Sequence, residues 1–169
     1  MIGCIQMKGQ NLSVKSSMTM LATTTLNAEI AMPVSKSLSV HVPVLYNPWV
    51  FKQNSRIQQL TAMPGVRYWK QQYGVNYFCS AYLIASRYHM GGWLDKKYRY
   101  DGVGFGAGIG GGYSYVLTDH WNLDFEIGVG AVYVDYDKCA WQKNSRFYEN
   151  VKGIRLAVTK LDVSFIYFF

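Results

Sequence analysis

The last residues of the chain, Lys160-Leu-Asp-Val-Ser-Phe-Ile-Tyr-Phe-Phe169, decide how the rest of the sequence is interpreted. Side chains of a β-strand point alternately to its two faces, so residues two positions apart share a face. One face of this stretch is apolar and aromatic, with Leu161, Val163, Phe165, Tyr167 and Phe169. The other face is polar, with Lys160, Asp162 and Ser164. The stretch therefore predicts a strand that separates an apolar environment from a polar one.

The composition extends this two-faced pattern to the whole chain. Half of the 169 residues are apolar and 16% are aromatic, yet the mean hydropathy is −0.04, because apolar and polar residues are interleaved. No segment reaches the roughly 18 consecutive apolar residues that a transmembrane helix needs. A closed β-barrel is the other structure that satisfies every backbone group in lipid. A chain of this length forms one domain, which we assign to residues 11–169.

Alternating hydrophobicity and turn residues divide the chain into strands. Eight are predicted, at residues 12–20, 28–34, 38–46, 60–69, 77–87, 102–117, 122–135 and 154–169. Short connections at 35–37, 70–76 and 118–121 alternate with longer ones at 21–27, 47–59, 88–101 and 136–153. Outer-membrane barrels have this layout, with tight periplasmic turns and longer outer loops. The predicted fold is all-β, an eight-stranded antiparallel up-and-down transmembrane barrel, and the predicted location is the bacterial outer membrane.

The N-terminal segment and the cysteines add little to this fold. Residues 1–10 are expected to be a signal-peptide remnant or a disordered arm, because they hold only a fragment of an apolar core. Cys4, Cys79 and Cys139 are an odd number without a C-x-x-C pair. Neither a disulfide framework nor a zinc site is therefore expected, and no other metal or cofactor is predicted.

One segment indicates which face meets the lumen. From Gly102 to Gly112 every even position is glycine, while odd positions carry side chains such as Val103, Phe105 and Ile109. A glycine row weakens a strand, but inside a narrow barrel it leaves room for long side chains from the opposite wall. The glycine and polar faces are therefore predicted to line the lumen. No helical pattern follows the run, which argues against a nucleotide-binding Gly-x-Gly motif.

The polar faces of the strands collect a set of charged residues in the predicted lumen. The set comprises Lys15, Glu29, His41, Arg67, Asp124, Glu126, Lys160 and Asp162. Three fixed cations meet four carboxylates and one histidine, so the set is nearly neutral. Buried charges that stay unpaired are costly. We expect a network of ion pairs that plugs the barrel.

The chain carries a formal net charge of +7, and most of the positive charge outside the lumen set falls in the predicted long loops. These residues are Lys52, Arg56, Arg87, Lys96, Lys97, Arg99, Lys138, Lys143, Arg146 and Lys152. On the outer leaflet they would face lipopolysaccharide phosphates. Outer-membrane lipid and lipopolysaccharide are thus expected partners, and nucleic acid is not, because the charge forms no patch on a soluble fold.

Aromatic residues gather near both ends of the predicted strands, as in the two interfacial girdles of membrane barrels. The expected outer girdle contains Tyr46, Trp49, Tyr133 and Tyr136. The expected periplasmic girdle contains Tyr68, Tyr113, Tyr115, Trp121, Tyr167 and Phe169. The aromatic residues Phe165, Tyr167 and Phe169 also resemble the C-terminal signal that the barrel-assembly machinery reads, which makes this machinery an expected partner.

Several segments together resemble one family of small bacterial outer-membrane β-barrels. They are Tyr46-Asn-Pro-Trp49, Pro64-Gly-Val-Arg-Tyr-Trp69, Gly104-Phe-Gly-Ala-Gly108 with Gly112-Tyr113, and Trp121-Asn-Leu-Asp-Phe-Glu-Ile-Gly-Val-Gly130 running on to Tyr136-Asp137. The family is classed as a domain of unknown function and is often found beside fimbrial genes. The resemblance covers about residue 14 to Phe169. It implies an eight-stranded outer-membrane barrel, a fimbrial or other surface protein as partner, and no catalytic residues.

Two alternatives of other classes stay open. A lipid A-modifying barrel enzyme needs a histidine with carboxylate or serine partners at the outer rim, and only His89, with Asp95 and Asp101, is predicted near an outer loop. A soluble lipocalin-like barrel would bind a ligand in an apolar lumen and expose its polar face. The favoured interpretation is a non-enzymatic barrel with a filled lumen, in a structural or surface-interaction role such as adhesion or association with fimbriae.

Overall fold

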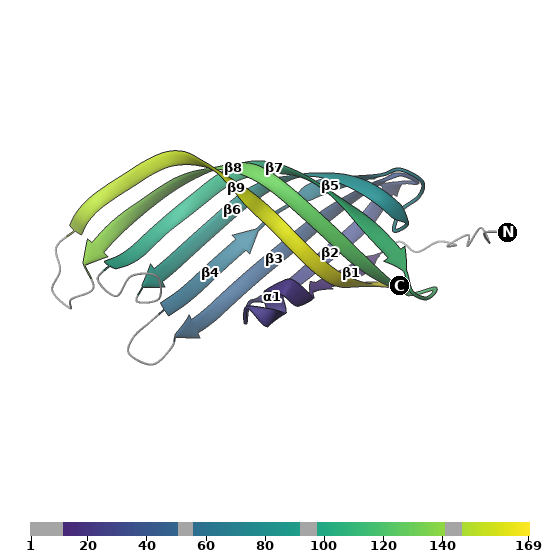
Figure 1. The fold of residues 1–169 in the computed structure, drawn as a ribbon, viewed down its shortest axis with the longest axis horizontal. Coiled ribbons are helices and arrows are strands. Elements are labelled where there is room, and N and C mark those ends of the chain that lie inside the picture. Colours follow the sequence, from purple (N-terminus) through teal and green to yellow (C-terminus); the bar gives the residue numbers. More distant parts are fainter. Residues whose placement is uncertain (1–11, 51–55, 92–97, 141–146) are drawn as a thin grey trace.

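The computed structural model describes residues 12–50, 56–91, 98–140 and 147–169, and its strands form one closed antiparallel barrel (Figure 1). The strands are β1 (Ser13–Ser17), β2 (Leu26–Ser35), β3 (Leu38–Val50), β4 (Arg56–Ala62), β5 (Gly65–Trp69), β6 (Asn76–Gly91), β7 (Tyr98–Val116), β8 (Trp121–Ala140) and β9 (Phe147–Phe168). A short helix, α1 (Met18–Ala22), follows β1. No helix in these described ranges is long and apolar enough to cross a membrane.

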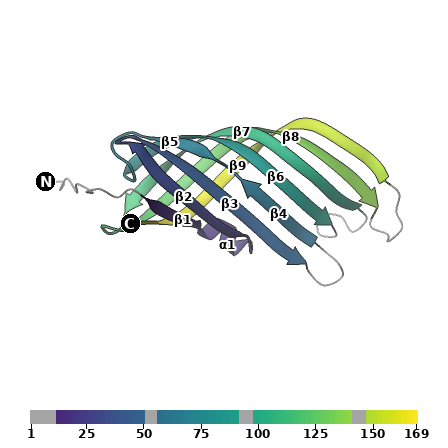
Figure 2. The ribbon, with the colours of Figure 1, turned by 180° about the vertical axis from the view of Figure 1, so that it is seen from behind.

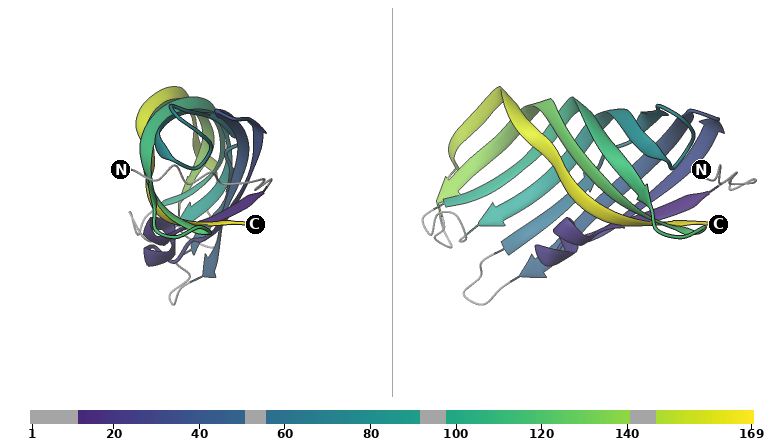
Figure 3. Two further views of the ribbon diagram at one scale, coloured as in Figure 1. Left: turned by 90° about the vertical axis from the view of Figure 1, so that its right-hand side faces the viewer. Right: turned by 45° about the vertical axis from the view of Figure 1, so that its right-hand side comes forward.

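Each strand pairs with the strands that come before and after it in sequence, except that β4 and β5 do not pair with each other, and the two ends of the chain close the ring (Figure 2). Closure runs from the pair Ser13–Phe168 to the pair Ser17–Ser164, between β1 and β9. Seen along the barrel, the strands surround one central axis (Figure 3). The predicted all-β, eight-stranded, antiparallel barrel is therefore confirmed. We call the end with the connections β2–β3, β5–β6 and β7–β8 the turn end, and the opposite end the loop end.

The fourth strand is interrupted, so β4 and β5 share one place in the wall. Both pair with β3 and with β6, and Met63 and Pro64 separate them. Proline has no N–H to give to a ladder, although its carbonyl still accepts from the N–H of Leu83 at 2.9 Å. The predicted strand 60–69 is thus made of two segments that occupy one strand position between β3 and β6.

The first strand is shorter than predicted, because residues 18–20 are helical and not extended. Ser17 has extended backbone and its hydroxyl accepts a hydrogen bond from the Met20 N–H at 3.2 Å. This is an N-cap, the arrangement by which serine starts a helix. Asn27 of β2 accepts from the Ser17 N–H at 2.5 Å and donates to the Ser17 carbonyl at 3.0 Å. These bonds end β1 at Ser17.

At the loop end the strands continue beyond the predicted limits. β3 reaches Val50, and β8 and β9 reach Ala140 and Phe147. The strict alternation of apolar and polar residues stops earlier, but backbone pairing continues. Several expected loop cations are therefore strand residues, namely Arg56, Arg87, Arg99, Lys138 and Lys152. The remaining five, Lys52, Lys96, Lys97, Lys143 and Arg146, lie outside the described residues, as do residues 1–10, Cys4 and Asp95.

Candidate functional site: the charged lumen and the outer rim

The centre of the lumen is the carboxylate of Glu126 on β8. Its Oε2 lies 2.8 Å from the guanidinium of Arg67 and 3.4 Å from Nζ of Lys15. Its Oε1 lies 3.1 Å from Nζ of Lys160 and accepts a hydrogen bond from the Ser80 hydroxyl at 2.8 Å. The Glu126 side chain has no exposed surface. Three cations from three different strands thus share one buried carboxylate.

Ion pairs continue outward from these cations. Arg67 also contacts Glu29 on β2, with the two charged groups 2.5 Å apart. Lys15 lies 3.0 Å from Asp162 and 4.0 Å from Asp124. The Asp162 side chain is 11% exposed, and the other charged side chains in these pairs are more deeply buried. The network therefore ties β1, β2, β5, β8 and β9 together across the lumen.

The structure places all the predicted lumen residues on the inner face of the barrel. Seven join the ion-pair network just described. The eighth, His41 on β3, is fully buried, and neither of its ring nitrogens has a hydrogen-bond partner in the described part of the chain. Its charge-free neutral form suits such a site, since burial disfavours an unpaired charge.

Aromatic rings close the lumen at the turn end. Trp69 packs on Phe78 with ring centroids 4.7 Å apart, and on Tyr73 at 5.7 Å. Tyr73 in turn contacts Phe168 at 5.5 Å. Gly74, at the tip of this turn, has φ of 81°, and a Cβ there would lie 2.6 Å from the Phe168 ring. Alternation could have indicated this aromatic plug, because Phe168 shares the inner face with Asp162 and Ser164.

A glycine-and-tyrosine contact fills the lumen on the loop side of the charges. Tyr82 of β6 lies over the glycines of β7 and β8: a Cβ at Gly108 would be 2.6 Å from its ring, and one at Gly128 would overlap its hydroxyl. Tyr82, Met63 and Ile84 form a buried apolar cluster. The glycines do face the lumen, but the ring that fills their space comes from the adjacent strand β6 and not from the opposite wall.

The outer surface is apolar around the barrel. Exposed side chains include Val42 on β3, Leu83 on β6, Ile109 on β7, Ile127 on β8 and Leu156 on β9, with exposures between 43% and 86%. We call this outward-facing apolar surface the belt. Aliphatic side chains in such number on the outside, with charges inside, are the reverse of a water-soluble domain.

Aromatic residues border the belt as predicted, with three differences, one of which is Trp49: it shares its face of β3 with the buried His41 and Asn47 and not with Tyr46. At the turn end Trp121 packs on Tyr167 with ring centroids 5.1 Å apart, and Tyr167 packs on Phe169 at 4.9 Å. Tyr77, which was not predicted, joins this group and packs on Tyr113 at 4.9 Å. At the loop end Tyr136 does not belong to the girdle: it pairs in register with Gly102, on the lumen face.

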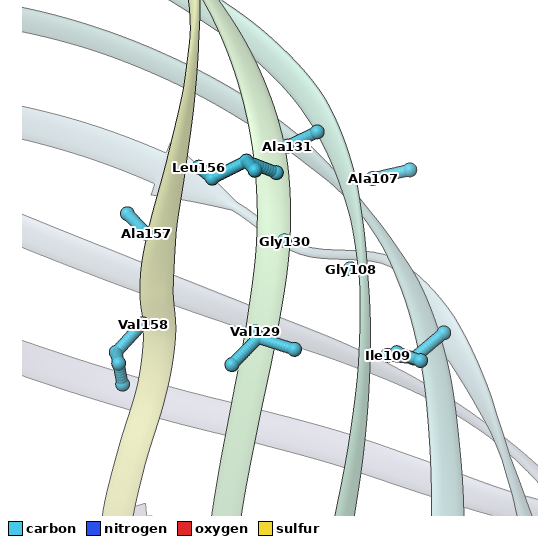
Figure 4. Close-up of a pocket in the computed structure, with 9 residues that line it drawn as sticks. All are labelled: Ala107, Gly108, Ile109, Val129, Gly130, Ala131, Leu156, Ala157 and Val158. Atoms are coloured by element: carbon cyan, nitrogen blue, oxygen red, sulfur yellow. The ribbon is translucent and has the colours of Figure 1, made fainter.

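A depression of about 640 Å³ interrupts the belt where small residues meet (Figure 4). Its lining includes Gly108, Gly130 and the alanines Ala107, Ala131 and Ala157 of three neighbouring strands. Larger side chains, such as Val129 and Leu156, stand around it. The lining is almost wholly apolar, which suits a hydrocarbon chain and not a polar substrate.

Beyond the belt, at the loop end, the outward positions become polar. His89 of β6 pairs in register with Asp101 of β7, and Nδ1 of the imidazole contacts the carboxylate. On the next strands Lys152 lies 2.8 Å from Asp135. The strands bring His89 and Asp101 together by register, where the sequence alone had only indicated a common loop. We call these polar positions the outer rim.

The ionisable groups of the lumen and of the outer rim differ in their exposure. The lumen charges are paired with one another, and no three His, Cys, Asp or Glu side chains in the described ranges form a group that could hold a metal ion. The thiol of Cys79 is free and exposed on the outer face. His89 has a carboxylate partner but is 39% exposed in its side chain.

Comparison with known proteins adds the family. No curated protein and no solved structure matches the chain significantly. The model of the family DUF3575, described as proteins of unknown function, matches residues 1–169. The chain, a small β-barrel, therefore belongs to the DUF3575 family of proteins of unknown function.

Proposed function

We propose that this chain is a non-enzymatic integral β-barrel of the bacterial outer membrane, with a side-chain-filled lumen and a structural or surface-interaction role. The observation that carries the proposal is the inverted distribution of polarity. Ile127 and Leu156 are 57% and 86% exposed on the outside, whereas Arg67 and Glu126 are 1% and 2% exposed inside. Exposing that much aliphatic surface to water is unfavourable, while exposing it to lipid costs nothing.

The girdles and the rim support the same proposal. Amphipathic rings such as Trp121 and Tyr46 prefer the membrane–water interface, and they border the aliphatic belt at its two ends. Polar pairs such as Lys152–Asp135 begin beyond that border. Lipopolysaccharide would meet the rim, and the C-terminal residues Phe165, Tyr167 and Phe169 suit recognition by the barrel-assembly machinery.

The filled lumen argues for a role other than conduction. Charged side chains from four strands meet at Glu126, counting its own, and rings at Trp69 and Tyr82 pack on either side of them. A protein built in this way would act through its outer surface and loop end. Binding of a fimbrial or other surface protein there is the role we propose, which is the kind of partner that the resemblance in the sequence implies.

One observation favours a second candidate, a lipid A-modifying enzyme. The contact between His89 and Asp101 lies on the outward face at the rim, where lipid headgroups would be found in an outer membrane. A histidine oriented by a carboxylate is the usual general base. No serine or further carboxylate is paired with it among the described residues, so the non-enzymatic role is preferred. The lipocalin-like alternative requires an apolar lumen and is disfavoured by the charges around Glu126.

The test is membrane insertion of the refolded protein. The full chain is refolded into detergent and into lipid vesicles, and its migration on SDS gels is compared with and without boiling, alongside far-UV circular dichroism. A β-rich spectrum with a shift on boiling, and flotation with the vesicles, are the expected results. A protein that stays soluble without detergent and shows no shift would exclude the membrane barrel.

A further inference from the structure

The backbone edge of β9 is unpaired over most of its length. β1 pairs with β9 only from Phe168 to Ser164. From residue 163 back to residue 147, β9 pairs with β8 on one side, and no described strand pairs with it on the other. The right-hand view of Figure 3 shows β9, in yellow, as the border of the sheet along this stretch. β1 and β9 thus close the barrel only at its turn end. We call the stretch of β9 from residue 147 to residue 163, where no described strand pairs with its second edge, the seam.

The chain itself turns away from the seam. Ser17 caps α1 and is bound by Asn27, so the polypeptide leaves the wall where β1 would have continued along β9. Thr19 of α1 then accepts a hydrogen bond from the Val163 N–H at 3.0 Å. The Thr19 hydroxyl thus gives one backbone N–H of the β9 edge a hydrogen-bond partner. Beyond Val163 toward the loop end, no contact among the described residues gives a partner to the backbone N–H and C=O groups that point away from β8.

The inner face of β9 is uncovered along the same stretch. Arg155 pairs in register with Val132, which packs on the apolar cluster inside the lumen, yet Arg155 is exposed. The neighbouring inner position Ala157 is exposed as well, and a Cβ added to Gly153 would meet no atom within 4 Å. The guanidinium of Arg155 has no ion-pair or hydrogen-bond partner in the described ranges. Among the described strands, none covers this side of β9.

The outward residues of this stretch belong to the belt. Ile154, Leu156 and Val158 are 73%, 86% and 63% exposed. If the belt lies in lipid, then so does the unpaired backbone between them. Each backbone polar group without a partner in hydrocarbon costs several kcal/mol, so open sheet edges do not persist there. The edge therefore requires a hydrogen-bonding occupant.

We propose that the free edge of β9 binds an extended strand of a partner protein, which takes the place that β1 leaves. This strand runs antiparallel to β9, presents apolar side chains to the lipid beside Leu156, and presents an acidic side chain to Arg155. The recognition mode is strand addition, in which backbone bonds supply affinity and alternate side chains supply specificity. The inference rests on the proposed membrane location, because that location is what makes the open edge costly.

A second copy of this chain is a poorer occupant. Two β9 edges facing each other would bring together Lys152 and Arg155 of both copies, and like charges held close together are repelled. Copies inserted in the same direction would also present β9 strands that run the same way, whereas the barrel is antiparallel throughout. An acidic, alternating strand meets neither objection.

The test uses the full chain in lipid vesicles and a synthetic strand as probe. The probe is a capped peptide of about eight residues that alternates Val with Thr and carries one central Glu, long enough to pair with the seam on both sides of Arg155. Binding is read by fluorescence anisotropy, and pairing by hydrogen exchange of residues 150–162. We expect saturable binding and slower exchange in this segment only. The same peptide with N-methylated amides, which cannot pair, should not bind.

Charge exchange tests the specificity. Arg155→Glu should weaken binding of the Glu peptide by at least about tenfold and strengthen binding of a Lys peptide by a similar factor. Lys70→Glu, a matched reversal at the turn end, should change neither. Equal binding of the N-methylated peptide, or no change with Arg155→Glu, would overturn the proposal. So would slow exchange, in the peptide-free protein, of those amides of residues 150–162 that do not donate to β8, which would point to pairing with a second copy.

Failure of this inference and failure of the proposed function are separable. Quenching of tryptophan fluorescence by brominated lipids, measured in the same vesicles, reports insertion without any peptide. Insertion without protection of β9 would reject the strand-binding edge alone. Absence of insertion would reject the membrane barrel, and the edge proposal with it.

Discussion

The hydroxyl of Tyr82 on β6 and the hydroxyl of Thr159 on β9 share a hydrogen bond of 2.6 Å, although two strands lie between them. The tyrosine ring spans β7 and β8 only because Gly108 and Gly128 leave the space. A β-bulge opposite Gly128 and Val129 places Thr159 as an extra residue of β9, so that Thr159 and Lys160 both reach the lumen. The contact between Tyr82 and Thr159 therefore depends on both the glycine run and the bulge.

Gly128→Val should destabilise the barrel by about 1–3 kcal/mol, because the new side chain must displace the Tyr82 hydroxyl from a filled lumen. The change in the free energy of unfolding is measured by urea unfolding in detergent, with loss of the heat-dependent gel shift as the readout. Gly153→Ala is the matched control, because a Cβ there meets no atom within 4 Å. Equal stability of both variants and the unsubstituted protein would show that Tyr82 does not occupy this space.

Arg67→Ala should cost roughly 3–5 kcal/mol, since it leaves the buried carboxylates of Glu29 and Glu126 without their closest cation. The same unfolding assay applies. Lys152→Ala removes an exposed partner of Asp135 and should leave the unfolding midpoint almost unchanged. An unchanged unfolding midpoint for Arg67→Ala would contradict the lumen network.

A lysine in the middle of the belt should be far more costly than one at its border. Ile127→Lys is expected to lose about 2–4 kcal/mol in lipid, and Tyr115→Lys, in the turn-end girdle, about 0–1 kcal/mol. The folded fraction after refolding into vesicles over a urea series gives both values. Small and equal effects at the two positions would mean that the outer face contacts water.

His89→Ala should leave the lipid A of the host unchanged, because the proposed role is non-enzymatic. Mass spectrometry of lipid A from cells that express either form, compared with cells lacking the protein, is the measurement. A modification that appears with the unsubstituted protein and disappears with His89→Ala would instead establish the enzyme, with Asp101 as the orienting carboxylate.

Asn27→Ala should destabilise the turn from β1 into α1 without unfolding the barrel. Its side chain makes two hydrogen bonds to the backbone of Ser17, where β1 turns into α1, and loss of such bonds costs about 0.5–1.5 kcal/mol each. Hydrogen exchange should quicken at residues 15–20 and stay slow in β7. Uniform acceleration across the barrel would show that Asn27 supports the whole fold.

Much of the fold was predictable, because period-two alternation reports which face of a strand meets which environment. All the predicted lumen charges lie on the inner face, and the predicted order of strands is observed. The predicted ends of some strands were wrong, because alternation of apolar and polar residues does not report where backbone pairing stops. Helical residues 18–20 follow a serine whose capping bond forms locally, and β8 and β9 extend past the belt because pairing needs no alternation.

The sequence by itself determined the two faces of each strand, and with them the apolar outside and the charged inside. It could do so because side-chain direction in a strand depends only on position along the chain. Tertiary structure alone decided which charges meet at Glu126, that Tyr82 reaches Thr159, and that β9 keeps a free edge. These relationships depend on register, on one bulge and on the point where β1 ends, and each is set by contacts between residues far apart in the chain.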